Sequence, residues 1–188
     1  MKKIAVLFSG QGSNFAYLAQ KLHLEEVEIV VALTNNPEAE GIAIAHQYHI
    51  PVHVLDSKQY ESRELFDQQV VSLLLEAEVE LTVLAGFMRI LTPVFTQQIR
   101  AINLHPSLLP RHKGLHAIEK SYADDYPTGG VTVHWVNSEL DGGAIILQRE
   151  IVKEGLAFEA YHQNIRRIEK EILVEAVRVA LSLTQIPK

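Results

Sequence analysis

Residues 4–15 read IAVLFSGQGSNF, an apolar run of five residues followed at once by a glycine-rich loop. The apolar run has the length and the composition of a buried β-strand. After the loop, apolar residues recur at helical spacing from Phe15 to Leu22. A buried strand that leads through a glycine loop into a helix is typical of an α/β fold.

The amino-terminal half of the chain repeats this alternation. We predict further strands in residues 27–33, 51–55, 81–85 and 101–104, and helices in residues 38–48, 62–76 and 93–98. Because the strand segments are apolar without interruption, both faces of the sheet are expected to be covered, as in a parallel sheet. Asn36 and Pro37 are the expected cap and first turn of the first of these helices. The second helix is expected to place on one side Leu65, Val70, Leu73 and Leu74.

The pattern changes in the carboxy-terminal part. Two strand-like runs, residues 131–136 and 144–148, flank a turn in residues 137–143 and predict an antiparallel hairpin. A long amphipathic helix is expected over residues 158–183. The predicted fold is α/β, a Rossmann-like open sheet that is parallel in its amino-terminal half, with an antiparallel hairpin in its carboxy-terminal part and helices on both faces. No repeat or linker is visible, so we expect a single domain over residues 1–188.

The composition narrows the class of protein. The chain of 188 residues is 47% hydrophobic and carries a net charge of −6. Nucleic acid is not the expected partner, because no basic stretch could replace the counterions of a phosphate backbone. The absence of cysteine excludes disulfides, thiolate metal ligands and cysteine nucleophiles. No apolar run approaches the length of a membrane span, and residues 4–8 are too short for a signal peptide, so we expect a cytoplasmic protein.

Residues 102–110 read INLHPSLLP and place Asn103 and His105 two residues apart at the end of a predicted strand. Side chains at i and i+2 of a strand point to the same face, and open α/β sheets bind ligands at the carboxyl ends of their strands. Asn is a neutral donor suited to a developing oxyanion, and His titrates near neutral pH. The pair predicts half of an acyl-transfer site. Alternatively, it is a strand end whose polar groups are solvated or bonded to turn backbone.

The loop in residues 9–14 predicts a phosphate site, because glycine lets backbone amides approach an anion and a helix amino-terminus adds a favourable dipole. We expect Gly12, Ser13 and Asn14 to hold a mononucleotide or a sugar phosphate. The dinucleotide fingerprint is absent, since Phe15 replaces its third glycine and no acidic residue follows the second strand. This argues against an NAD-linked oxidoreductase. The alternative is a tight turn in which Ser13 only caps the helix.

Residues 139–143 read ELDGG and place one carboxylate, Asp141, in the predicted hairpin turn. Asp before two glycines is ordinary turn chemistry. A carboxylate beside His105 would in addition favour the charged imidazolium and prepare it to donate a proton or to stabilise an oxyanion. Both interpretations stay open at this point.

The remaining histidines do not predict a metal site. His46 and His49 fall on a predicted helix without a carboxylate at the spacing that helical zinc motifs require. His112 and His116 lie in a predicted loop, and His134 lies on a predicted strand, where it is either a core residue or a support for the site. We therefore expect no metal.

Several segments together resemble one family. They are residues 9–14 (SGQGSN), 84–91 (LAGFMRIL), 102–110, 114–116 (GLH) and 139–143. In this order and over nearly the whole chain, they are similar to the phosphoribosylglycinamide formyltransferases, folate-dependent enzymes of purine synthesis. Residues 103–110 alone identify only the wider group, which includes methionyl-tRNA formyltransferase and formyltetrahydrofolate deformylase. The glycine loop and the lack of the extra domains expected of those two enzymes narrow the choice.

The resemblance implies transfer of a formyl group from 10-formyltetrahydrofolate, a cosubstrate, to the amine of glycinamide ribonucleotide (GAR). It implies a GAR- and phosphate-binding half, about residues 1–100, and a folate-binding and catalytic half, about residues 101–188. The implied catalytic residues are Asn103, His105 and Asp141. The implied GAR site consists of Gly12, Ser13, Asn14 and Glu169. The implied folate site consists of Arg63, Met88, Arg89, Ile90, Leu91, Asn103, Val136 and Asp141.

The chain departs from the family pattern at Gln11, where Asn is usual, and in residues 128–130, which lead to the hairpin. Neither departure removes a catalytic group. Three alternatives remain: a related folate-dependent formyltransferase with another acceptor, a formyltetrahydrofolate hydrolase, and a non-catalytic nucleotide- or sugar-phosphate-binding module. The expected partners are the two small-molecule substrates, with neither nucleic acid nor membrane, and the chain is expected to be a monomer or a homodimer.

Overall fold

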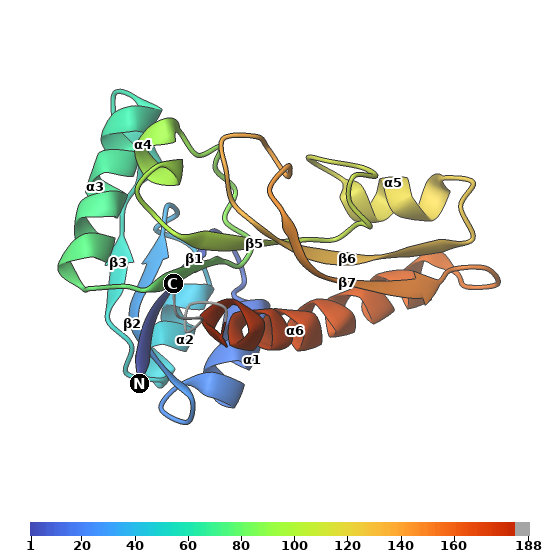
Figure 1. Cartoon of the computed structure of the whole chain (residues 1–188), viewed down its shortest axis with the longest axis horizontal. Helices are drawn as coiled ribbons and strands as arrows, with labels where there is room; N and C mark the ends of the chain where they lie inside the picture. Colours follow the sequence, from blue (N-terminus) through green and yellow to red (C-terminus); the bar gives the residue numbers. More distant parts are fainter. Residues whose placement is uncertain (183–188) are drawn as a thin grey trace. The chain divides into compact units, whose positions relative to one another are not determined.

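The structure is a computed structural model that describes residues 1–182 (Figure 1). The described residues form two compact units, one of residues 1–102 and one that begins at residue 103. The boundary between the units falls inside one strand, β5 (Ala101–His105). The single formyltransferase domain expected over the whole chain stays a prediction. Within residues 1–182, no helix combines the length and the apolar composition that crossing a bilayer requires.

The first unit is built on a parallel sheet. Its strands are β1 (Lys2–Phe8), β2 (Val27–Thr34), β3 (Val52–Val54), β4 (Leu81–Leu84) and the start of β5. They pair in the order β3-β2-β1-β4-β5, and β1 runs parallel to β2 and to β4 while β2 runs parallel to β3. Residues 4–8 of β1 and all of β4 are buried. The unbroken apolar runs thus form buried parallel strands, as predicted.

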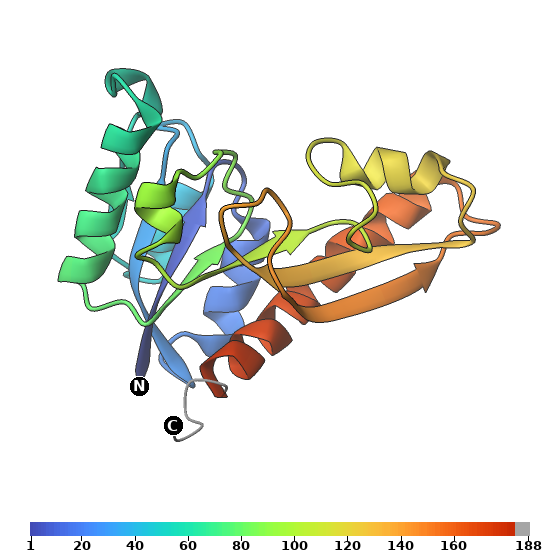
Figure 2. The same ribbon diagram turned by 45° about the horizontal axis from the view of Figure 1, so that its top comes forward.

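Helices cover both faces of this sheet. They are α1 (Ser13–Leu22), α2 (Gly41–Gln47), α3 (Arg63–Glu76), the short α4 (Pro93–Thr96) and a 3₁₀ turn, η1 (Ser57–Gln59). Figures 1 and 2 show α1 and α2 on one face of the sheet and α3 and α4 on the other. The two sets of helices thus enclose the buried apolar strands.

The helix α3 begins where predicted but buries a different side. Ser62 caps it, because its Oγ accepts a hydrogen bond from the N–H of Leu65 at 3.1 Å. The buried stripe consists of residues four apart, which are Phe66, Val70 and Leu74. Leu65 precedes this stripe by one position, about 100° around the helix, and is 45% exposed. The prediction that Leu65 lies on the buried side was therefore wrong.

The helix α2 begins later than predicted. Its cap residue is Glu40, so the prediction that Asn36 caps it was wrong. The Asn36 Oδ1 accepts a hydrogen bond from the N–H of Glu38 at 3.0 Å, and its Nδ2 donates to the carbonyl of Ser9 at 3.2 Å. An Asn side chain bonded to the backbone two residues onward stabilises a turn in place of a helix start.

The second unit consists of a hairpin and two helices. Its elements are the end of β5, α5 (Ala117–Ala123), β6 (Thr128–Trp135), β7 (Ile145–Val152) and α6 (Phe158–Ser182). The strand order is β5-β6-β7, and β6 and β7 are antiparallel, with Thr128 opposite Val152. Figure 2 shows α6 running along this hairpin, where it packs against both strands.

The predicted fold class is confirmed: the sheet is parallel in the amino-terminal half and ends in an antiparallel hairpin. The hairpin strands are longer than predicted. The prediction for β7 ended too early because its later residues alternate between exposed and half-buried, include charged side chains and therefore do not form an apolar run. The helix α5 was not predicted. The last residue of the predicted long helix, Leu183, lies outside the described residues.

Candidate active site

The carboxyl end of β5 presents Asn103 and His105 to the hairpin turn of the same unit. Asp141 Oδ1 lies 3.4 Å from Nδ2 of Asn103, and Asp141 Oδ2 lies 3.5 Å from Nδ1 of His105. The i, i+2 spacing on a strand accounts for the shared direction of the first two side chains. The structure therefore brings together the three residues that the sequence predicts to be catalytic.

Asp141 is a buried carboxylate with one short hydrogen bond, which its Oδ2 accepts from the backbone N–H of Gly114 at 2.9 Å. Burial by itself raises the pKa of this carboxyl. The contact with His134, the N–H of Gly114 and the positive charge of His105 outweigh burial and lower the pKa below its ordinary value of 3.8. Asp141 is thus a fixed negative charge in a nearly dry environment.

His105 is held by the backbone of the loop that follows it. Its Nε2 lies 2.8 Å from the carbonyl oxygen of His112. Because a carbonyl only accepts hydrogen bonds, Nε2 carries a proton. The other ring nitrogen, Nδ1, faces the carboxylate of Asp141 at 3.5 Å. A second proton on the ring would therefore reside at Nδ1 and complete an ion pair.

His134, whose role the sequence left open, lies beside the same cluster. Its Nδ1 donates to the carbonyl of Trp135 at 2.9 Å, so neutral His134 offers the lone pair of Nε2. That nitrogen lies 3.3 Å from Nδ2 of Asn103 and 3.6 Å from Oδ1 of Asp141. Its place on β6 alone gave no signal for this role, because the partners come from distant segments.

The turn that carries Asp141 depends on backbone geometry. Asp141 has φ 52°, in the left-handed region that Asp tolerates better than most residues. A Cβ on Gly143 would lie 1.6 Å from the carbonyl oxygen of Trp135, so only glycine fits there. The ELDGG segment is thus both a tight turn and the support of a buried carboxylate beside His105. The catalytic role of Asp141 stays a prediction.

In the first unit, the glycine loop joins β1 to α1. Gly12 is the cap residue of α1, with φ 74°, and Ser13 is the first residue of the helix. The alternative in which Ser13 caps the helix was therefore wrong. A Cβ on Gly12 would lie 2.7 Å from Cα of Gly41, so glycine is required by both conformation and space. The loop directs the amino-terminal N–H groups of α1 away from the helix, the arrangement that favours an anion.

Ser9, which the sequence did not single out, connects three loops at the strand ends. Its Oγ donates to Oδ1 of Asn35 at 2.6 Å and accepts from the N–H of Met88 at 2.8 Å. Its backbone N–H donates to the carbonyl of Gly86 at 3.0 Å. The only sequence signal is a polar residue directly after an apolar strand, which is too common to be specific.

The segment expected to contact folate follows β4. Met88 and Ile90 are 71% and 55% exposed, although both are large apolar residues. Between them, the Arg89 guanidinium lies 4.1 Å from the centre of the Phe66 ring. Leu91 follows, half-buried. Adjacent exposed apolar side chains of this kind are typical of a ligand-contacting surface.

Buried hydrogen bonds between α3 and Thr92 hold the end of the segment 88–91. The Asp67 Oδ2 accepts hydrogen bonds from both the N–H and the Oγ1 of Thr92, each at 2.8 Å. Arg63 is exposed on α3, one turn before the ring on which Arg89 packs. The first unit thus contains the implied folate residues Arg63 and 88–91 on α3 and on the loop that packs against it.

Two further predicted residues lie in the second unit. Glu169, on α6, is 1% exposed, and its Oε2 lies 3.1 Å from Nη1 of Arg166. Val136 is half-buried and directly follows β6. Within residues 1–182, no group of three or more His, Asp or Glu side chains is arranged to hold a metal ion.

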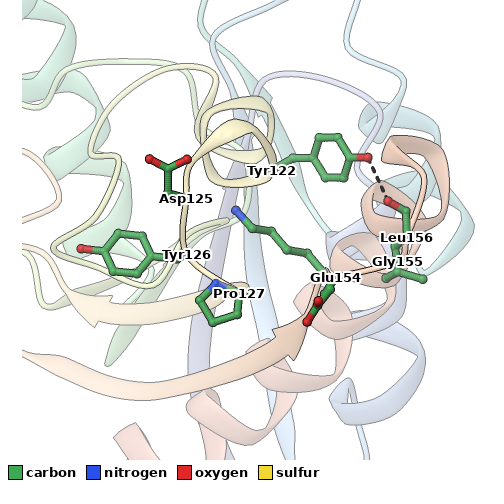
Figure 3. A pocket seen from close by; sticks show the side chains of 8 residues that line it. Tyr122, Asp125, Tyr126, Pro127, Glu154, Gly155 and Leu156 are labelled. Carbon is green, nitrogen blue, oxygen red and sulfur yellow. Dashed lines mark hydrogen bonds between the residues drawn. The ribbon is translucent and has the colours of Figure 1, made fainter.

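The second unit also contains a cavity of about 520 Å³, shown in Figure 3. It is lined by Tyr122 of α5 and by residues 125–127 and 153–156. Tyr122 Oη donates to the carbonyl of Leu156 at 2.8 Å across it. None of the residues predicted from the sequence lines this cavity, so the candidate site is the cluster around Asp141.

Comparisons with known proteins agree on one family. A family model described as formyl transferase matches residues 2–177. The phosphoribosylglycinamide formyltransferase of Haemophilus influenzae is 40% identical over 155 residues, which are 80% of this chain and 73% of that protein. The protein of that name from Bacillus subtilis is 35% identical over 188 residues, covering 97% of this chain and 96% of its own.

A solved structure extends this similarity to the fold. The phosphoribosylglycinamide formyltransferase from Campylobacter jejuni subsp. jejuni NCTC 11168 aligns with a TM-score of 0.94 at 48% identity. The alignment covers 96% of this chain and 97% of that one. The likeness therefore includes both the parallel strands and the hairpin.

The lowered pKa of Asp141 predicts a pH dependence of stability. A carboxyl whose pKa is lower in the folded state contributes stability that is complete above its unfolded value, near 3.8, and is lost as the pH falls through the folded value. We expect Asp141→Asn to reduce the free energy of unfolding at pH 7 and this deficit to shrink below pH 3.8. Urea unfolding of both proteins across pH 2–7 checks this. A deficit that is constant or grows on acidification would contradict it.

The contacts of Ser9 predict a cost for its removal. We expect Ser9→Ala to lower the free energy of unfolding by about 0.5–1.5 kcal/mol, the net contribution of an ordinary hydrogen bond, because the solvent-exposed N–H of Met88 exchanges its Ser9 acceptor for water. The amide of Met88 should also exchange its hydrogen faster. The matched control is Ser72→Ala, which removes an exposed hydroxyl from α3 and should leave both quantities unchanged. Equal unfolding curves for the two variants would refute the role of Ser9.

Proposed function

Because the chain belongs to the formyl transferase family, we propose that it transfers the formyl group of 10-formyltetrahydrofolate to the primary amine of GAR. The relatives of this name match nearly the whole chain. The observation that carries the proposal is the convergence of Asn103, His105 and Asp141 in one buried cluster. A non-catalytic phosphate-binding module would have no use for an amide, an imidazole and a buried carboxylate in such a cluster.

The proposed reaction is a direct transfer. The neutral amine of GAR attacks the formyl carbon, a carbon–nitrogen bond forms, and the carbonyl oxygen becomes an oxyanion. Collapse of this intermediate breaks the bond between the formyl carbon and the folate nitrogen. The amine loses a proton and the folate nitrogen gains one, so the reaction is balanced. Proximity and stabilisation of charge are the contributions required of the protein.

Asn103 and His105 are the proposed donors to the oxyanion. The two N–H bonds of the Asn103 amide point at protein acceptors 3.3 and 3.4 Å away, which are long hydrogen bonds. A developing oxyanion is a stronger acceptor and would displace one of them. Since Nε2 of His105 is bonded to backbone, the Nδ1 proton is the one that remains for the substrates, and its donation requires release from the 3.5 Å contact with Asp141.

Asp141 is proposed to hold the proton on Nδ1 of His105 and to fix the orientation of the ring. Its lowered pKa keeps it charged throughout the neutral range, so it acts as a counter-ion and not as the proton donor. His134 lies against both Asp141 and Asn103 and supports their positions.

The binding of the two substrates is proposed from each unit by itself. The loop at Gly12, Ser13 and Asn14, with the amino-terminus of α1, suits the phosphate of GAR. In the second unit, taken by itself, the buried carboxylate of Glu169 suits an amine group of GAR. In the first unit, the exposed apolar surface around Met88, with Arg63 on α3, suits the ring system of the folate. In the second unit, Val136 is proposed as a separate folate contact.

Removing the proposed oxyanion donor tests the chemistry. We expect Asn103→Ala to lower kcat about 100- to 1000-fold with smaller changes in either KM, the usual loss for one such donor. Consumption of 10-formyltetrahydrofolate is followed with and without GAR. Gln47→Ala, which removes an exposed amide from α2, is the control and should match the wild type. An Asn103→Ala enzyme with full kcat would contradict the assignment, and GAR-independent consumption by the wild type would indicate hydrolysis.

The phosphate loop is tested through Ser13. We expect Ser13→Ala to raise the KM for GAR about 10- to 100-fold, since a hydrogen bond to a charged group contributes about 1.5–3 kcal/mol, and to leave the KM for the folate nearly unchanged. Ser72→Ala serves as the control. A variant of Ser13 that affects only the folate KM would assign the loop to the other substrate. Gly12→Ala is a poorer probe, because it strains the backbone as well.

A further inference from the structure

A series of polar contacts in the second unit begins at Lys153, which directly follows β7 and is buried. Its Nζ donates to the carbonyl of Ser121, to the carbonyl of Asp124 at 2.9 Å, and to Oδ1 of the same aspartate. A lysine ammonium has three N–H donors. All three are therefore matched by oxygens, as a buried cation requires.

The Asp124 carboxylate extends these contacts to His112. Its Oδ2 lies 2.6 Å from Nε2 of His112, and its Oδ1 accepts from the N–H of Tyr126 at 3.0 Å. Burial by itself raises the pKa of this carboxyl, but the hydrogen bonds from Lys153, His112 and Tyr126 lower it below its ordinary value of 3.8. We refer to Lys153, Asp124 and His112 as the salt-bridge network.

The network ends at a strained backbone position. His112 has φ 55°, in the left-handed region that residues other than glycine rarely adopt. Such a conformation persists where its surroundings hold it. The imidazole of His112 is tied to Asp124, and the carbonyl of the same residue accepts from Nε2 of His105. The side chain thus anchors the backbone that directs this carbonyl.

We propose that the salt-bridge network positions His105 for formyl transfer, a role that rests on the proposed function. The network holds the carbonyl of His112 against Nε2 of His105, so that the ring keeps its proton there and turns Nδ1 toward Asp141. Lys153, Asp124 and His112 do not touch the reacting atoms; they are positioning residues that act through His105.

Two substitutions at His112 test the proposal by loss and rescue. With both substrates at saturation, His112→Ala is expected to lower kcat about 10- to 100-fold and to change each KM less than about twofold, because a misplacement near 1 Å costs on the order of 100-fold. His112→Gln keeps an N–H close to the place of Nε2 and is expected to recover most of the lost kcat. A His112→Ala enzyme as fast as the wild type, or a His112→Gln enzyme as slow as His112→Ala, would overturn the proposal.

A spectroscopic measurement separates positioning from mere stability. In the full chain labelled with ¹⁵N-histidine, the Nε2 proton of His105 should be observed and should exchange slowly with water in the wild type and in His112→Gln. In His112→Ala it should exchange markedly faster. If the variant only loses stability, its unfolding midpoint falls while this proton stays protected, and positioning is ruled out.

Neighbouring aspartates supply a matched pair of variants. Asp124→Asn keeps an acceptor for Lys153 but presents an N–H to His112, so it should reproduce the loss in kcat. Asp125→Asn makes the same change of charge at an exposed neighbour and should retain the wild-type kcat. A wild type without GAR-dependent turnover would refute the proposed function. A wild type that turns over, with Asp124→Asn as fast as Asp125→Asn, would refute the positioning role alone.

Discussion

The buried carboxylate of Asp141 is the interaction on which the candidate site depends. A negative charge removed from water must be compensated by donors and by positive charge. The N–H of Gly114 supplies a short hydrogen bond, the Asn103 amide supplies a longer one, and His105 supplies a neighbouring cation when its Nδ1 is protonated. These partners come from a loop and from β5, so the charge fixes their relative positions. The direction in which His105 presents Nδ1 is one consequence.

In the first unit, neutral hydrogen-bonding groups hold the loops at the ends of the strands. Parallel strands end at one edge of the sheet, where their loops must be held apart and still leave backbone N–H groups for a ligand. Ser9 joins the loops after β1, β2 and β4 by hydrogen bonds to Asn35, Met88 and Gly86. Gly12 then allows α1 to begin with its amino-terminal N–H groups directed outward. Because these contacts are neutral, the only charge proposed for this loop is that of a bound phosphate.

Much of the fold could be predicted from the sequence because its buried parallel strands are continuously apolar and its helices α1 and α6 are amphipathic. Elements for which the local sequence is compatible with more than one structure were harder to predict. Asn36 forms a turn in place of a helix cap, and the short, mixed segment at α5 lacks a clear period. The prediction that Leu65 is buried failed because apolar residues occur on more than one side of α3, and the side that contains Phe66 is the one that packs in the core.

The candidate site divides in the same way. Asn103 and His105 were predictable because a strand of period two places them on one face. His134 and Asp124 were not, because each acquires its role from partners that are distant in the sequence, and no local pattern records them. A carboxylate in a glycine turn could be predicted as a turn from chemistry alone. Its burial beside an imidazole is a property of the folded chain.

Formyl transfer is tested most directly by following the carbon itself. The enzyme is incubated with GAR and with 10-formyltetrahydrofolate that carries ¹³C in its formyl group, and the labelled products are distinguished by their NMR signals. We predict that the label appears in a new amide of GAR in an amount equal to the tetrahydrofolate released. Label recovered as formate, or folate consumed at the same rate without GAR, would contradict the proposed activity.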